Sequence, residues 1–192
     1  MQETITLTFP DSIKGEYPKG IKLQEIAKDF QQHFNSDIVG AIVNNELKEL
    51  WVEINQDCSL QFIDRTTVYG SRFYSRSLAF LFIIAAKEVF EGCRVTKIEE
   101  KMRELQKLDI PFEKRKISNA EAIELFTKTQ QFDKVNLIKY RKKKYINIYR
   151  CHGYYDYFYG YMVPSTGYLK IFELKSNKPG IVLRYPERSE PN

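Results

Sequence analysis

The chain has 192 residues, of which 43% are hydrophobic and 29% are charged, and its formal net charge is +5 at pH 7. This composition is typical of a folded globular protein and excludes an intrinsically disordered chain. The longest apolar run, from Leu78 to Ala86, has about half of the roughly 20 residues that cross a bilayer, and it lies mid-chain, where no signal peptide is found. We therefore expect a cytoplasmic protein without membrane contact, built from two small domains.

The three cysteines, Cys58, Cys93 and Cys151, lie far apart in the sequence. Their number is odd and none belongs to a Cys-x-x-Cys pair, which argues against a disulfide framework and against a zinc site. The chain has two histidines, His33 and His152, and Cys151 and His152 would point to opposite faces of a strand. Reduced thiols and no bound metal are expected.

The first 64 residues have the pattern of a small mixed domain. Apolar residues alternate with threonines over residues 4–9, which predicts a half-buried strand, and Gly15 and Pro18 predict a hairpin after it. Over residues 21–30 the apolar spacing changes to i, i+3, i+4, i+7, which predicts a helix. Further strands are expected at residues 39–44, 50–54 and 59–64. The expected order is strand, strand, helix, strand, strand.

This region resembles a TGS domain, a small module with a β-grasp fold. The resemblance is carried by ITLTFPDSIKGEYPKGIKLQEIAKDF, VGAIVNNELKELWVEI and LQFID. Members of this family accompany threonyl-tRNA synthetases, certain GTPases and stringent-response synthetases, and their motifs hold no catalytic residues. The resemblance implies a β-grasp domain over residues 1–65.

Residues 70–192 predict a second domain, of α+β class with an antiparallel sheet. The stretch FYSRSLAFLFIIAAKEVF, residues 73–90, is apolar on nearly every face and predicts a central packed helix. A second helix is expected from Val95 until Pro111, where it cannot continue, and a third after Ser118, which stands three residues before Glu121 as in a capping box. Strands are expected from Val135 onward, at residues 135–140, 145–150, 155–163, 167–174 and 181–186.

The stretch YFYGYMVPSTG, residues 157–167, says more about the function than any other part of the sequence. Its residues predict a strand buried on both faces and then a chain reversal. It also resembles the Cys-x-x-x-His strand and Val-Pro-Asn-Thr-Gly turn of the second additional domain of threonyl- and alanyl-tRNA synthetases. That domain has a His-x-x-x-His pair on a long helix as well. On this pattern the four metal-ligand positions hold Arg76, Phe80, Phe158 and Met162. None of these side chains can replace the nitrogen and thiolate ligands, so we expect no metal and no catalytic residues.

A resemblance to bacterial uridine kinase-like proteins covers essentially the whole chain. In that family a TGS domain and a degenerate second-additional-domain-like unit precede a P-loop nucleoside kinase domain. The resemblance is carried by residues 154–192, by DIPFEKRKIS and by RSLAFLFIIAAKEVF. This chain differs from that family between Arg94 and Val95, where the family has a further pair of strands around a Gly-Tyr-Tyr type segment.

The sequence contains no Gly-x-x-x-x-Gly-Lys-Ser/Thr, the loop that cradles phosphates in a kinase. The resemblance therefore implies an N-terminal part of a larger enzyme. ATP and Mg would bind in the absent kinase domain, and no cofactor is expected in this chain. Its partner would be that C-terminal kinase domain.

The first function hypothesis is a non-catalytic regulatory or ligand-binding region of such a kinase, with a small molecule in the cleft where the editing site would lie. Tyrosine rings would offer stacking faces, and Arg76 a charge. The candidate residues are Arg76, Tyr154, Tyr155, Asp156, Tyr157, Tyr159, Tyr161, Ser165 and Thr166. Alternatively the tyrosines pack the sheet, because only alternate residues of a strand face one cleft.

A second hypothesis is an RNA-binding or tRNA-binding module that uses two local basic runs. These runs are Lys114, Arg115, Lys116, Arg141, Lys142, Lys143 and Lys144. Solvated surface loops would have the same composition. A residual aminoacyl-tRNA editing hydrolase is a third hypothesis, opposed by the lost ligands. An enzyme that uses Asp156 and Glu173 alone is a fourth, and no spacing in the sequence pairs these two carboxylates.

Overall fold

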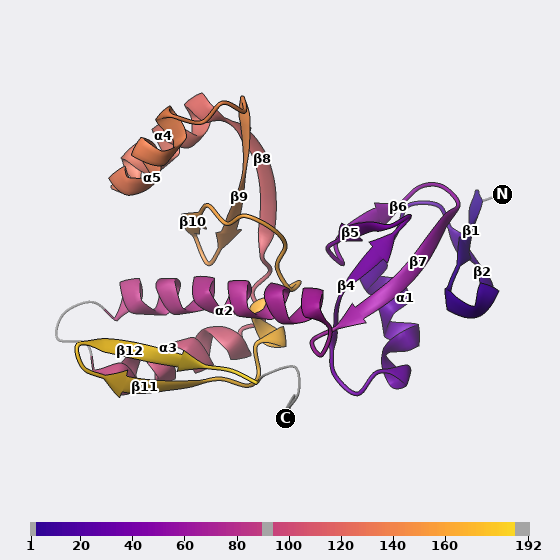
Figure 1. Cartoon of the computed structure of the whole chain (residues 1–192), viewed down its shortest axis with the longest axis horizontal. Coiled ribbons are helices and arrows are strands. Elements are labelled where there is room, and N and C mark those ends of the chain that lie inside the picture. The colour runs from indigo at the N-terminus through magenta and orange to yellow at the C-terminus, as the bar shows by residue number, and fades with distance from the viewer. Residues whose placement is uncertain (1–2, 90–93, 187–192) are drawn as a thin grey trace. The chain divides into compact units, whose positions relative to one another are not determined.

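Apolar and polar side chains alternate along β1 (Thr4–Thr8) in the computed structural model of the protein, which describes residues 3–89 and 94–186. Ile5 and Leu7 are buried, as the alternation predicts. β1 lies in a five-stranded sheet of order β2-β1-β7-β4-β5, in which β1 and β7 are parallel and the other neighbours antiparallel (Figure 1). The other strands are β2 (Lys14–Pro18), β4 (Ile38–Val43), β5 (Glu46–Lys48) and β7 (Cys58–Asp64).

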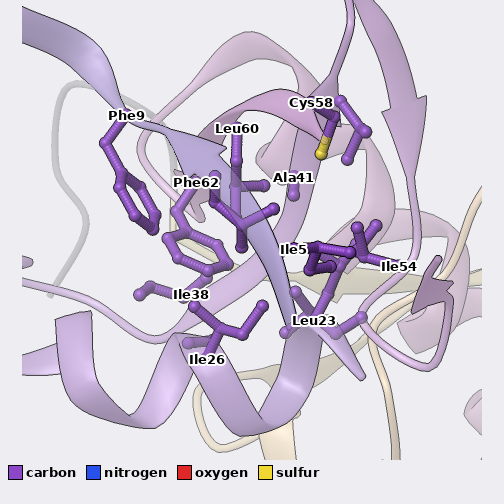
Figure 2. Packing of buried hydrophobic residues seen from close by; sticks show 14 residues of the cluster. Ile5, Phe9, Leu23, Ile26, Ile38, Ala41, Ile54, Cys58, Leu60 and Phe62 are labelled. Atoms are coloured by element: carbon purple, nitrogen blue, oxygen red, sulfur yellow. The ribbon is translucent and has the colours of Figure 1, made fainter. Parts of the chain in front are cut away.

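Helix α1 (Leu23–Phe30) packs against this sheet through its apolar stripe. Leu23, Ile26 and Ala27 are buried and join strand residues such as Leu60 and Phe62 in one hydrophobic core (Figure 2). The short elements around α1 are η1 (Pro10–Ser12), β3 (Ile21–Lys22), η2 (Gln31–His33) and β6 (Glu53–Ile54), with β3 and β6 paired antiparallel. Strands precede and follow the helix as expected, but there are three before it and four after it rather than two and two, and only Glu53–Ile54 of the strand expected at residues 50–54 is strand. A mixed sheet with one covering helix is a β-grasp arrangement.

Helix α2 (Val68–Glu88) begins four residues after β7 ends. Thr67 caps it: its Oγ1 accepts a hydrogen bond from the Gly70 amide at 3.0 Å and donates one to the Asp64 carbonyl at 2.8 Å. A Cβ on residue 70 would lie 1.8 Å from that carbonyl oxygen, so the approach requires glycine. The helix starts five residues earlier than predicted, and its buried residues along the whole length confirm a central packed helix.

Helix α3 (Val95–Lys107) packs against α2 and against two C-terminal elements, η3 (Thr166–Tyr168) and β11 (Glu173–Asn177). β11 forms a hairpin with β12 (Gly180–Arg184). The Arg103 guanidinium stands 3.7 Å from the centroid of the Phe172 ring and donates to the carbonyls of Lys170 and Phe172. The segment after η3 is thereby attached to α3.

The chain packs as two units, one formed by Met1–Ile110 with Tyr161–Asn192 and the other by Pro111–Gly160. This division differs from the domains expected at residues 1–65 and 70–192, because the second unit is inserted within the C-terminal part. Its elements are β8 (Glu113–Ser118), α4 (Asn119–Lys128), α5 (Phe132–Lys139), β9 (Tyr145–Cys151) and β10 (Tyr154–Asp156). Its strands form an antiparallel sheet of order β10-β9-β8, which confirms the α+β class (Figure 1).

The two helices of this unit cover one face of its sheet. Ile146 and Ile148 of β9 are buried in a cluster with Phe126 of α4 and with Val135 and Ile138 of α5. Helix α4 starts with the predicted capping box: the Ser118 side chain accepts from the Glu121 amide, and the Glu121 carboxylate accepts from the Ser118 amide.

Several predicted strands are wrong. Residues 135–140 lie largely in helix α5, because Val135 and Ile138 bury one helical face at a spacing of three. Residues 155–163 are strand only as far as Asp156. Of residues 167–174, the first two lie in η3 and the last two in β11, and residues 169–172 have no regular secondary structure. Strand β8 was not predicted, since its sequence EKRKIS holds one apolar residue and pairs at the edge of the sheet.

Cys58 and Cys151 are free and buried, and Cys93 lies outside the described residues. Burial raises the pKa of the Cys151 thiol to about 12. Within residues 3–89 and 94–186, no helix combines the length and the apolar character needed to cross a membrane.

Candidate functional site

The stretch of residues 157–167 leaves the sheet after Asp156 instead of continuing as a strand. Gly160 has a φ of 116°, which breaks the extended conformation. Two later amides bond to side chains rather than to a neighbouring strand: Met162 N donates to Glu49 Oε1 and Val163 N to Ser77 Oγ, both at 3.0 Å. Met162 and Val163 are buried. The segment is therefore held by buried polar side chains of β-grasp and α2 residues.

Three of the four positions that match the metal ligands of the related domain are buried or bonded within the fold. Arg76 donates to the carbonyl of Tyr161, while Phe80 and Met162 are each 1% exposed. Phe158 belongs to the 111–160 unit. Among the described residues, no group of three or more histidine, cysteine, aspartate or glutamate side chains is placed to hold a metal ion.

The tyrosines of the predicted ligand cleft divide between the two units. Tyr154, Tyr155 and Tyr157 lie in the 111–160 unit, where Tyr155 and Tyr157 pack against the core under α4 and α5. Tyr159 is 85% exposed. Tyr161 belongs to the other unit, with its ring centroid 5.4 Å from that of Phe73. The structure therefore places these rings in different surroundings, and a shared cleft stays a prediction.

The two candidate carboxylates also have separate partners. Asp156 is 3% exposed, forms a 2.6 Å ion pair with Lys134 of α5, and accepts a hydrogen bond from the Tyr157 amide. Glu173 lies on the exposed hairpin of the other unit, 3.4 Å from Lys175. Asp156 thus fastens β10 to α5.

Ser165 and Thr166 attach the turn to the end of α3. Thr166 Oγ1 donates to the Leu105 carbonyl at 2.7 Å and accepts from the Ile110 amide at 2.8 Å. Asp109 Oδ1 accepts from Ser165 Oγ and, at 3.1 Å, from the Gly167 amide. Because both hydroxyls are buried in these contacts, their first role is to hold the turn.

A cavity of about 350 Å³ lies beside this turn, on the side of helix α1. Its lining includes Gln24 and Asp37 of the β-grasp part, and Asp109, Tyr168 and Lys170. Lys170 Nζ contacts both Asp37 carboxylate oxygens, at 3.0 and 2.8 Å. Burial raises the pKa of Tyr168, and its hydrogen bond with Gln24 partly offsets that effect. The lining combines apolar side chains with polar groups and charges of both signs, which suits a small ligand that has polar groups.

The 111–160 unit carries the positive charge of the protein. It holds eleven lysines and arginines against five aspartates and glutamates, a formal net charge of +6. The rest of the chain holds 19 basic and 20 acidic residues, a net charge of −1. An anionic partner would therefore be attracted to this unit rather than to the chain as a whole.

The strand register brings the two basic runs of this unit to the same end of its sheet. β8 pairs with β9 so that Lys116 is opposite Asn147 and Ser118 is opposite Tyr145. Residues directly opposite each other lie on one face, and Ile146 and Ile148 occupy the other face, under the helices. The Lys142–Lys144 loop leads directly into Tyr145 (Figure 1).

We call the resulting surface the basic platform. It consists of Lys116, Lys142, Lys143, Lys144, Tyr145 and Asn147, all of which are exposed. The loop is fixed at its base, because the Asn119 amide donates to the Lys144 carbonyl at 3.1 Å and Asn119 Nδ2 to the Lys143 carbonyl at 2.8 Å. The platform therefore presents four ammonium groups on a defined backbone.

Three of the seven predicted RNA-binding residues lie outside the platform. Lys114 donates to the Gly160 carbonyl at 3.4 Å and stands over the buried Tyr149 ring. Arg141 donates to the Tyr157 hydroxyl at 3.0 Å and stands over that ring. Arg115, opposite Ile148, is on the helix-covered face of the sheet.

Tyr145 and Asn147 were missing from the predicted site. The signal that could have found them is the alternation in YINIYR, where the two isoleucines mark the buried face and residues 145 and 147 the open one.

The chain is similar over most of its length to threonine–tRNA ligases. It is 28% identical over 195 residues to that of Francisella tularensis subsp. novicida (strain U112), covering 88% of this chain and 31% of the relative. It is 30% identical over 200 residues to the threonine–tRNA ligase of Thermotoga maritima, and the match covers 90% of this chain and 30% of the relative. It is 28% identical over 195 residues to the threonine–tRNA ligase of Coxiella burnetii (strain RSA 493), and the match covers 88% of this chain and 30% of the relative.

The chain thus spans about 30% of the length of these curated relatives. No family model matches it. The similarity supports the predicted relation to the N-terminal region of threonyl-tRNA synthetase. The relation to uridine kinase-like proteins stays a prediction.

Proposed function

We propose that this chain is an RNA-binding module that contacts tRNA through the basic platform. The observation that carries the proposal is that the strand register brings Lys116, 26 positions before Lys142 in the sequence, to the same end of the sheet as the Lys142–Lys144 loop and the exposed Tyr145. The similar proteins are named for a ligase that acts on tRNA, which favours this function over the other hypotheses. The net charge of +6 on the 111–160 unit provides long-range attraction for a polyanion.

Lysine contacts to phosphates release counterions, so binding should weaken steeply with salt. Each phosphate contact adds about 0.7–0.9 to the slope of log K against log salt concentration. The four platform lysines should therefore account for a slope of roughly −3. Such contacts hold a backbone in position without reading its sequence.

The test is fluorescence anisotropy with labelled tRNA at several KCl concentrations between about 50 and 200 mM, a range over which phosphate contacts weaken strongly. The platform variant replaces Lys116, Lys142, Lys143 and Lys144 by glutamine. The control variant removes the same charge from exposed lysines of the other unit, Lys14, Lys22, Lys97 and Lys107.

We expect the platform variant to lose most of the affinity at low salt and most of the salt slope, and the control variant to keep both. Equal losses in the two variants would mean that net charge alone attracts the RNA. Wild-type binding without salt dependence would contradict the proposal directly.

A second candidate is the regulatory or ligand-binding region of a uridine kinase-like nucleoside kinase, with the kinase domain as its partner. The cavity of about 350 Å³ beside η3 favours it, since that volume suits a nucleoside or an amino acid. Thermal unfolding in the presence of uridine, cytidine, their nucleotides and free amino acids tests it. A saturable rise in the midpoint that is lost in Tyr168→Ala supports it, because a ligand stabilises the state it binds. No shift with any of these compounds refutes it.

A further inference from the structure

We infer that the basic platform takes an unpaired stretch of RNA and stacks one of its bases on Tyr145. This inference rests on the proposed function, and it adds the kind of RNA and the residue that selects it. Tyr145 is the first residue of β9 and is 56% exposed, whereas Ile146 and Ile148 of the same strand are each 1% exposed. A large ring thus stands on a rigid strand and faces away from the core.

The surroundings of the ring favour a stacked base. Lys116 Nζ lies 5.2 Å from the centroid of the Tyr145 ring, a distance at which an ammonium is attracted to the ring face. A cation on one face leaves the opposite face as the one that a base can cover. Base–aromatic stacking tolerates any base, because every base has a π-face.

The lysines place the RNA backbone next to this ring. Lys142, Lys143 and Lys144 are exposed and immediately precede Tyr145 in the chain, so a strand bound along them brings its bases to the ring. Asn147 lies two residues along the same face and has both a donor and an acceptor for a base edge. A positively charged track beside an aromatic side chain is the arrangement that binds single strands.

A duplex cannot use this arrangement fully. Its bases are stacked on one another, so their faces are covered, and only loops, bulges and ends supply a free base face. Duplex RNA would therefore contact the lysines and leave Tyr145 without a stacking partner. The inference is a preference for unpaired RNA that depends on the ring of residue 145.

The experiment measures anisotropy of a labelled 12-nucleotide RNA, single-stranded or annealed to its complement, with wild type, Tyr145→Leu, Tyr145→Phe and Tyr159→Leu. Leucine keeps an apolar side chain and removes the ring, and phenylalanine keeps the ring. Tyr159 is an 85% exposed tyrosine of the same unit outside the platform, so it is the matched control. Thermal unfolding of each variant verifies that it is folded.

Wild type should bind the single strand more tightly than the duplex. Tyr145→Leu should weaken single-strand binding about tenfold, within the range for one stacked base, and leave duplex binding and the salt slope unchanged. Tyr145→Phe and Tyr159→Leu should bind like wild type.

Unchanged single-strand binding by Tyr145→Leu, or equal losses for both RNAs, overturns the inference. If the platform variant still loses tRNA binding in that case, the proposed function stands without the stacking site. If the platform variant binds tRNA like wild type, the proposed function itself fails.

Discussion

The substitution Ser77→Ala tests whether the Ser77 hydroxyl holds residues 161–163 against helix α2 and so stabilises the fold. Its hydroxyl is fully buried, donates to the Phe73 carbonyl at 2.9 Å and accepts from the Val163 amide at 3.0 Å. Ser77→Ala would leave a buried amide without its partner, which costs about 1–3 kcal/mol. Alanine has a helix propensity better by about 0.5 kcal/mol, which offsets part of that cost. We expect a net loss of about 1–2 kcal/mol in the free energy of unfolding.

The matched control is Ser75→Ala on the same helix. Ser75 Oγ donates to the Arg72 carbonyl at 3.3 Å, so the same substitution removes a similar helical hydrogen bond and leaves the Val163 contact intact. For a chain of this size, 1–2 kcal/mol corresponds to a fall of about 2–8 °C in the unfolding midpoint. The assay is thermal unfolding followed by circular dichroism. Equal midpoints for the two variants would refute the claim that Ser77 holds the segment.

Three further outcomes are expected. Gly70→Ala should destabilise the protein by about 1–3 kcal/mol despite alanine's better helix propensity, because its Cβ would meet the Asp64 carbonyl oxygen at 1.8 Å; a urea midpoint at or above wild type would contradict this. Cys151 should resist alkylation in the folded protein at pH 8, since burial raises its pKa to about 12. Rapid alkylation of the peptide that contains Cys151, detected by mass spectrometry, would refute this. The hydrogen bond from the Ser118 amide lowers the pKa of Glu121 below 4.5, so this carboxylate adds stability above that pH, and the contribution is lost as the pH falls through the lowered value. Glu121→Gln should therefore reduce the difference in unfolding midpoint between neutral and acidic pH, and an unchanged difference would count against the capping box.

Much of the β-grasp part could be predicted because β1, α1, β4 and β7 each have a clear local signal, whereas the short strands β3 and β5 were not predicted. Alternation over β1, the apolar stripe of α1 and the turn residues between the strands all agree with the fold. The pairing of β1 with β7 in parallel joins residues about 50 positions apart and has no local signal. The capping box at Ser118 could also be predicted, because it depends only on two residues three positions apart, Ser118 and Glu121.

The 111–160 unit was harder to predict because its aromatic and apolar residues suit either structure. Val135 and Ile138 have a helical spacing, but the short run around them also has the composition of a strand. β8 was missed because three of its six residues are basic, and only pairing with β9 makes it a strand. The lysines of the candidate site were visible in the sequence, whereas their common face with Tyr145 depends on the register of β8 and β9.

The basic platform and the ligand cleft predicted around Arg76 and residues 161–166 differ in whether the fold already uses their side chains. A ligand site at these residues would need Arg76 and Thr166, whose side chains already bond to the carbonyls of Tyr161 and Leu105 and so hold the 161–166 segment against α2 and α3. The amide of Met162 in the same segment is bonded to Glu49. A site on the basic platform uses exposed side chains whose removal leaves the core intact. Binding at the platform can therefore change by surface substitutions alone, and it needs only charge and one aromatic ring. For this reason we expect variants of the platform to lose RNA affinity without losing stability, and variants at residues 161–166 to lose stability first.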